Sequence, residues 1–262
     1  MVEQFFDKGW HVFAPEACIE TWGQHAHKDA IRALKDPSLA QWYECENTWF
    51  VGLDALDNDA QGRVAGSEPL SGHAVDFITK HLGGWPALHR AQLSGVFPGY
   101  PRPRASESEA GFRYRRDRDA AHVDGVIGLG QPKRRFVQEP HAFILGVPLT
   151  DADEAAAPLV VWEGSHKIMQ HALARAFNTT KSNRLEDLDV TDIYQSARRQ
   201  AFETCPRRVV HGRPGSAIVV HRLALHGVAP WASGAKAAPE GRLIAYFRPP
   251  MRGGAKEWCR AP

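Results

Sequence analysis

The stretch FILGVPLTDADEAAAPLVVWEGSHK, residues 143–167, contains two short apolar runs separated by an acidic, small-residue turn. Short apolar runs bounded by turn signals are typical of buried β-strands. Working outward, similar β-rich runs recur on both sides of this stretch. Together they cover residues 92–97, 111–118, 141–149, 158–162, 208–211, 217–221 and 243–247. This spacing predicts a mainly β protein with a sandwich or jelly-roll core.

Helical patterns flank the β-rich runs. Residues 16–35 carry apolar side chains at helical spacing, with acids early and bases late, as the helix dipole favours. Ser71 is expected to cap a helix that runs to Leu82 and stops at Gly83 and Gly84. Two further helices are expected after Ser165 and near Thr191. The sequence thus predicts a single domain, 1–262, with a mostly helical N-terminal layer (1–90), a jelly-roll core (91–250) and a C-terminal tail (251–262).

Composition restricts the class of protein. The 262 residues carry a formal charge of only +2, which gives no argument for nucleic-acid or membrane-surface binding. The four cysteines form no CxxC pair, so a reducing, cytoplasmic setting is expected. There is no signal-peptide pattern at the N-terminus and no apolar stretch of ~18 residues, the length that a membrane span needs.

The pair His122 and Asp124 is the first candidate for chemistry. On an extended chain, residues two apart point to the same face, so an imidazole and a carboxylate can converge on one ion. His226, placed after the apolar strand at 217–220 and its continuation, is a candidate third ligand. Two histidines and one carboxylate leave open positions on iron, which suits an oxygenase better than a closed structural site.

Three segments resemble the phytanoyl-CoA dioxygenase family of iron(II)- and 2-oxoglutarate-dependent oxygenases. They are AAHVDG (residues 120–125), the stretch 143–167 quoted above, and GRPGSAIVVHRLALHGVAPW (residues 212–231). The resemblance implies a double-stranded β-helix fold of the jelly-roll, cupin-like type. It assigns the metal, Fe(II), to His122, Asp124 and His226. It leaves His221 as a supporting residue and the runner-up ligand, and His166 as a structural hydrogen-bonding residue.

The family also implies 2-oxoglutarate as cosubstrate and O2 as oxidant. The outer carboxylate of 2-oxoglutarate requires a buried cation, and the planar fork of arginine matches a carboxylate. In the segment GRLIAYFRPP, Arg242 is the preferred residue for this role. Arg248 lies on the same face by alternation and stays a competitor.

The implied activity is hydroxylation of a small-molecule C–H bond with release of succinate and CO2. Asp124 supports hydroxylation over halogenation, because halogenases of this broad fold have a small residue there; desaturation and ring formation stay open. The alternatives are a non-catalytic protein or a cupin-like metal-binding protein that uses no 2-oxoglutarate. The basic run Arg113 to Arg118 is interpreted either as a solvated strand face or as an attraction for an anionic substrate. The polar segment 179–189 is interpreted as a plain loop or a lid. The oligomeric state is not predicted.

Overall fold

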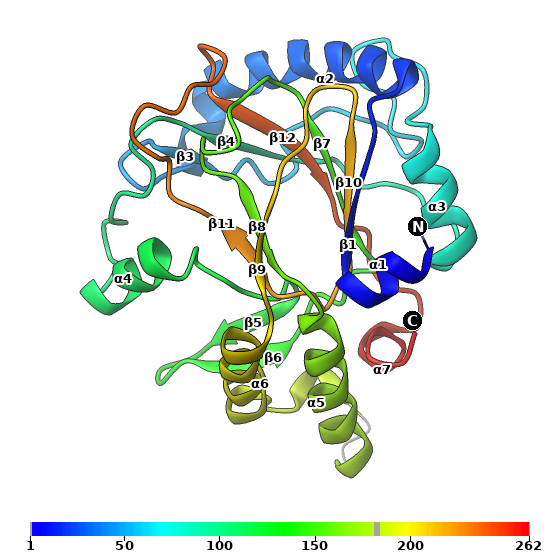
Figure 1. The fold of residues 1–262 in the computed structure, drawn as a ribbon, viewed down its shortest axis with the longest axis vertical. Coiled ribbons are helices and arrows are strands. Elements are labelled where there is room, and N and C mark those ends of the chain that lie inside the picture. Colours follow the sequence, from blue (N-terminus) through cyan, green and yellow to red (C-terminus); the bar gives the residue numbers. More distant parts are fainter. Residues whose placement is uncertain (1, 181–183, 262) are drawn as a thin grey trace.

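The computed structural model describes residues 2–180 and 184–261 (Figure 1). Its helices are α1 (Val2–Lys8), α2 (Ala17–Lys35), η1 (Pro37–Trp42), α3 (His73–His81), α4 (Glu109–Asp117), α5 (Ser165–Thr179), η2 (Leu185–Asp187), α6 (Thr191–Thr204) and α7 (Gly254–Trp258). Its strands are β1 (Trp10–Phe13), β2 (Tyr43–Glu44), β3 (Trp49–Phe50), β4 (Gln92–Val96), β5 (Val126–Leu129), β6 (Arg134–Val137), β7 (Ile144–Pro148), β8 (Leu159–Trp162), β9 (Arg207–Val210), β10 (Ala217–Val220), β11 (His226–Val228) and β12 (Arg242–Phe247).

The strands form two facing sheets and a hairpin. The large sheet has the order β1-β10-β7-β12-β4-β3-β2, the small sheet has the order β11-β8-β9, and β5 pairs with β6. An isolated bridge between His122 and His226 adds the segment before β5 to the edge of the small sheet. Neighbouring strands in all three sheets run antiparallel.

The chain winds between the two sheets as a double-stranded β-helix. From β4 onward it passes through the large sheet (β4), the small sheet (His122), the large sheet (β7), the small sheet (β8, β9), the large sheet (β10), the small sheet (β11) and the large sheet (β12). This order confirms the expected jelly-roll fold, a mainly antiparallel architecture with flanking helices.

Strand β12 shows how side-chain alternation builds the layers. Leu243, Ala245 and Phe247 are fully buried on the outer face of the large sheet, in one apolar cluster with residues of α2 and α3. Figure 1 shows α2 lying along this sheet. Trp22 of α2 packs on Phe247 with ring centroids 6.0 Å apart. Burying each large apolar side chain contributes about 1.5–3 kcal/mol, so this layer anchors the sheet that carries the inward-facing residues.

The even-numbered residues of β12 point into the space between the sheets. Arg242, Ile244 and Tyr246 alternate with the outward residues, and Tyr246 packs against the interior apolar cluster. In the small sheet, Leu159 and Val161 of β8 face the same interior, whereas Val160 and Trp162 pack with α5 and α6. Side-chain alternation along β12 thus places Arg242 and Tyr246 between the two sheets.

The structure corrects several local predictions. Residues 111–118 were expected as a strand but lie mostly in helix α4, because Ser108 caps its first turn by accepting from the Gly111 N–H. Arg113 and Glu109 also pair at the favourable i, i+4 spacing. Helix α3 begins after Gly72, so Ser71 is not its N-cap. The N-terminal region holds the expected helices together with β1, β2 and β3, which were too short for the pattern to reveal.

The segment 179–189 is described only in part. Residues 181–183 lie outside the described residues, so the choice between loop and lid is not addressed there; Leu185–Asp187 forms η2. Among residues 2–180 and 184–261, no helix combines the length and the apolar character that crossing a membrane requires.

Candidate metal centre

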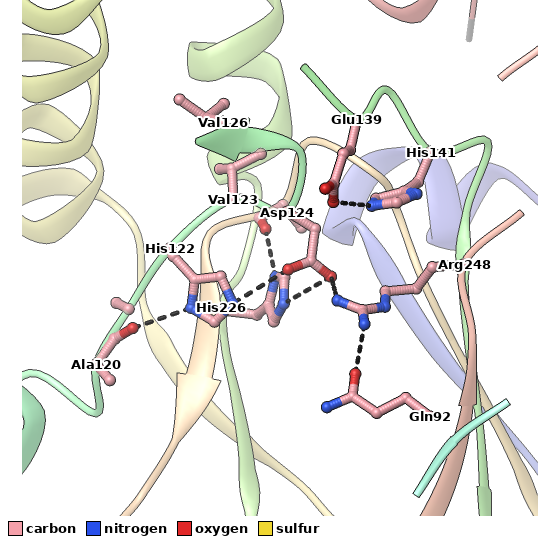
Figure 2. Close-up of polar contacts among 12 residues, drawn as sticks. Gln92, Ala120, His122, Val123, Asp124, Val126, Glu139, His141, His226 and Arg248 are labelled. Carbon is pink, nitrogen blue, oxygen red and sulfur yellow. Dashed lines mark hydrogen bonds and ion pairs between the residues drawn. The ribbon is translucent and has the colours of Figure 1, made fainter. Parts of the chain in front are cut away.

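His122, Asp124 and His226 converge at one end of the barrel (Figure 2). Nε2 of His122 lies 3.1 Å from Oδ1 of Asp124, and Nε2 of His226 lies 3.7 Å from Oδ2. One ligand atom from each residue lies within 4.8 Å of the others. The three side chains could therefore hold a single metal ion, and the described residues contain no other such group of three.

The backbone brings the two histidines together. His122 and His226 exchange both backbone hydrogen bonds, at 2.8 and 3.0 Å, so their side chains lie on the same side of an antiparallel pair. Gly227 permits this approach, because a Cβ built there would lie 2.1 Å from the backbone oxygen of Asp119. The sequence suggested that His226 lies at the end of the strand at 217–220 and its continuation. Instead, the chain turns after Val220, and His226 opens β11 in the other sheet.

The other ring nitrogen of each histidine is held by the backbone. Nδ1 of His122 lies 2.9 Å from the Ala120 carbonyl oxygen, and Nδ1 of His226 lies 2.9 Å from the Ala224 carbonyl oxygen. A carbonyl oxygen can only accept, so each Nδ1 donates and each neutral ring leaves the Nε2 lone pair toward Asp124. Such partners orient a ligand and raise its basicity.

Burial and charge set the protonation of the centre. Burial lowers the pKa of His226 to about 4, so its ring is neutral at physiological pH. Burial disfavours charge on Asp124 as well, but the Arg248 guanidinium and the two imidazoles hold the pKa of that carboxyl well below its usual range. Burial lowers the pKa of His122, but the hydrogen bond and the charge attraction to Asp124, with the hydrogen bond to Ala120, together outweigh it and raise the pKa.

The centre is accessible from one side. The side chains of Asp124 and His226 are 10% and 9% exposed, whereas that of His122 is 47% exposed. A cavity of about 200 Å³ adjoins the three residues. Its lining is largely apolar and includes Trp49, Val51, Ile144, Val220 and Tyr246. A small molecule could enter here and lie beside a bound ion with few polar groups around it.

The two candidate arginines have different surroundings. Arg248 lines the cavity, with Nη1 3.3 Å from Oδ2 of Asp124 and Nη2 donating to the amide oxygen of Gln92 (Figure 2). Arg242 is 5% exposed and lies beyond the cavity lining. Burial raises the pKa of the Tyr246 hydroxyl, and the charge of Arg242 and a hydrogen-bonding interaction with it oppose that rise. None of the three guanidinium nitrogens of Arg242 has a hydrogen-bond partner of acceptable geometry within the described residues.

The other candidate histidines lie apart from this centre. Nδ1 of His221 accepts from the Leu223 N–H, and its ring packs 4.6 Å from the ring of His166. His166 hydrogen-bonds the Phe6 carbonyl oxygen through Nε2 at 2.9 Å. Neither residue belongs to the three-ligand group. Both are therefore placed as packing residues between α1, α5 and the end of β10.

The basic run before His122 is largely neutralised. Arg113 pairs with Glu109, Arg115 with Glu107 and Arg116 with Asp117, at 3.1, 2.6 and 2.7 Å. The guanidinium of Arg118 lies 5.0 Å from the Phe202 ring centroid. The run therefore gives no support to an anionic substrate, since its charges already have partners within the chain.

Sequence reasoning missed several residues that shape the site. Gln92 accepts from Arg248 and also donates to the Val51 carbonyl oxygen, and Trp49 donates its indole N–H to the Ser94 hydroxyl at 3.3 Å. Alternation along β4 could have placed Gln92 and Ser94 on the inner face. Trp49 lies in a two-residue strand, for which no periodic signal exists.

No family model matches this chain, and no curated protein matches it. Solved structures with similar folds include SnoK, a non-heme alpha ketoglutarate dependent carbocyclase from nogalamycin biosynthesis (13% identity, 98% of this chain and 87% of that chain, TM-score 0.46). AviO1 from Streptomyces viridochromogenes Tue57 is similar at 15% identity over 95% of this chain and 94% of that chain (TM-score 0.49). EctD from S. alaskensis, solved with 2-oxoglutarate and 5-hydroxyectoine, is similar at 16% identity over 95% of this chain and 74% of that chain (TM-score 0.49). At these identities, any statement about chemistry depends on the geometry of the site itself.

Proposed function

We propose that this protein is an iron(II)- and 2-oxoglutarate-dependent oxygenase of the phytanoyl-CoA dioxygenase type. It hydroxylates a C–H bond of a small molecule and releases succinate and CO2. The observation that carries the proposal is the convergence of His122, Asp124 and His226 beside a cavity. Two imidazoles and one carboxylate on one face of an ion form the ligand set of non-haem iron oxygenases, with positions left open for cosubstrate and oxygen.

The donor set fits ferrous iron. Both histidines present Nε2 with Nδ1 held by a backbone carbonyl, and Asp124 is ionised. Arg248 pairs with the Asp124 carboxylate from the side away from the histidines (Figure 2). When bound, the metal and 2-oxoglutarate supply the oxidising chemistry; the chain orients the ligands and keeps the reacting carbon in a largely apolar cavity.

Arg242 fits the outer carboxylate of 2-oxoglutarate. A buried guanidinium without an acceptor is costly, and the cost is relieved when an anion binds it in a forked geometry. Tyr246 lines the cavity and lies beside Arg242, so its side chain connects the metal end of the barrel to this cation. Arg248 already has Asp124 and Gln92 as acceptors and is assigned to holding Asp124.

Turnover of 2-oxoglutarate tests the proposed function. Purified protein with iron(II), ascorbate and oxygen should convert 2-oxoglutarate to succinate slowly without substrate, and faster when a panel of small molecules includes an acceptor. Asp124→Ala should abolish this succinate release. No succinate under any of these conditions would indicate a non-catalytic protein or a cupin-like metal protein that uses no 2-oxoglutarate.

A further inference from the structure

Two tyrosine hydroxyls hold the backbone on either side of His122. The hydroxyl of Tyr114, on α4, donates to the Ala121 carbonyl oxygen at 2.6 Å. The hydroxyl of Tyr194, on α6, accepts from the Val123 N–H at 3.2 Å. The ligand residue therefore lies between two backbone groups that are each fixed by a side chain from a different helix.

One arginine links the two rings. The guanidinium carbon of Arg198, one turn after Tyr194 on α6, lies 4.9 Å from the Tyr114 ring centroid and 5.6 Å from the Tyr194 ring centroid. A guanidinium at these distances attracts the face of an aromatic ring. The three residues thus form a contiguous unit, which we call the tyrosine clamp: Tyr114, Tyr194 and Arg198.

The environment keeps the two hydroxyls neutral. Burial raises the pKa of Tyr114 to about 12 and also raises the pKa of Tyr194. Tyr194 is only 1% exposed, and Val123 is 2% exposed. Loss of the Tyr194 hydroxyl would therefore leave the Val123 N–H without its partner in a buried position, which is unfavourable. The backbone could recover this cost only by moving, and Val123 connects two metal ligands.

We propose that the tyrosine clamp is a positioning device for the metal centre, setting the spacing between His122 and the pair formed by Asp124 and His226. The inference rests on the proposed function, since it assumes that these three residues bind metal. Neither tyrosine is among the three ligand residues, so both act through the backbone and not as catalytic groups. Residues that support metal ligands in this way commonly change metal affinity by about 10–100-fold.

The chain offers a matched control for a purely structural role. Tyr43 donates its hydroxyl to the Leu34 carbonyl oxygen at 3.0 Å, in a partly buried site formed with α2 and not with the metal ligands. Tyr43→Phe therefore removes the same kind of hydrogen bond without touching the metal ligands. Arg198→Met removes the cation and keeps both hydroxyls, which covers the case in which the double tyrosine variant does not fold.

Anaerobic titration with cobalt(II), a spectroscopic substitute for iron(II), tests the inference. Tyr194→Phe and Tyr114→Phe/Tyr194→Phe should bind cobalt(II) about tenfold more weakly or worse, with an altered ligand-field spectrum, and Arg198→Met should weaken binding by a few-fold. Tyr43→Phe should match the wild-type protein in affinity and spectrum, whatever its unfolding temperature.

The outcomes separate the two claims. If the wild-type protein binds cobalt(II) and all the clamp variants behave as Tyr43→Phe does, the inference is overturned while the metal site stands. If the wild-type protein binds no cobalt(II), the metal site itself fails and the inference fails with it. Cobalt(II) binding without any effect of 2-oxoglutarate on the spectrum would count against the proposed function alone.

Discussion

One arginine opens strand β12 and another follows directly after its last residue, and the two have different surroundings. Arg248, after the strand, lies beside the three candidate ligands; its two Nη atoms pair with Asp124 and Gln92, whereas its Nε has no partner among the described residues. Arg242, at the start of the strand, is buried; the Tyr246 hydroxyl lies close to its guanidinium, but no hydrogen bond of good geometry and no carboxylate reaches it within the described residues. Arg248 lines the cavity, and alternation along β12 places Arg242 on the same inner face.

The difference shows how one residue type can serve two purposes. A cation that is already paired stabilises a fixed carboxylate and has fewer free hydrogen-bond donors for a ligand. An unpaired buried cation is a cost to the folded chain, which an incoming anion would relieve. Under the proposed function, Arg248 holds the ligand residue Asp124 and Arg242 receives the cosubstrate.

The largest expected effect distinguishes these two roles. Arg242→Leu should lower the affinity of the metal-loaded protein for 2-oxoglutarate by about 100-fold or more, because a forked, charge-assisted contact contributes about 2–4 kcal/mol. Binding can be measured by anaerobic calorimetry with cobalt(II) in place of iron(II). Affinity for cobalt(II) alone should be unchanged.

Arg248→Leu is the matched control, since it makes the same substitution on the same inner face, directly after β12. The assignment would be reversed if Arg248→Leu lost the cosubstrate and Arg242→Leu retained it.

The second expected effect is on the stability of the metal-free protein, which the two substitutions should change in different directions. Arg248→Leu should destabilise the metal-free protein by about 1–3 kcal/mol, because it leaves the buried Asp124 carboxylate without its cation; the partial exposure of Arg248 reduces the full cost of breaking a buried pair. Arg242→Leu should leave stability unchanged or raise it. Urea unfolding of both variants measures this difference, and equal destabilisation would show that Arg242 has a partner in solution.

The smallest expected effect concerns pH. The raised pKa of His122 means that metal binding must displace a proton, so affinity for cobalt(II) should rise with pH below that pKa, by at most about 1.4 kcal/mol per pH unit, and level off above it. His226, whose pKa is about 4, adds no proton release near neutrality. Calorimetry in buffers of different ionisation enthalpy should find up to one proton released per metal at the acidic side.

The binding of 2-oxoglutarate should depend on pH much less than the binding of metal does. Once metal is bound, 2-oxoglutarate affinity should change little between about pH 6 and 8, because an arginine does not titrate in that range. A steep pH dependence of this second step would show that a titrating group, not Arg242, receives the carboxylate.

Local pattern was sufficient for the strands that form the barrel. The apolar runs near β4, β7, β8, β10 and β12 were found because each is bounded by turn residues and buried on at least one face. The run near β9 was also found, although only Val210 of that strand is buried. The same reasoning failed at α4, where alternating Arg113 and Tyr114 looked like a strand. The Ser108 cap and the i, i+4 pairing of Arg113 with Glu109 stabilise a helix there instead.

The three residues that the structure brings together as candidate ligands could be named from sequence, but their setting could not. Spacing brings His122 and Asp124 to one face, yet the bridge to His226 depends on Gly227 allowing the close approach of the Asp119 backbone. Of the residues that hold this segment, Tyr114 lies seven residues before Ala121, whereas Tyr194 comes from a helix 71 residues after Val123. Such contacts follow from tertiary packing, for which a single sequence carries no local signal.

Addition of iron(II) and 2-oxoglutarate to the metal-free protein under anaerobic conditions tests the central claim most directly. If His122, Asp124 and His226 hold one ferrous ion with open positions, the mixture should develop a weak, broad visible absorption band from the chelate, and His226→Ala should not. Absence of the band in the wild-type protein, or an undiminished band in His226→Ala, would contradict the assignment of these three residues as the metal centre.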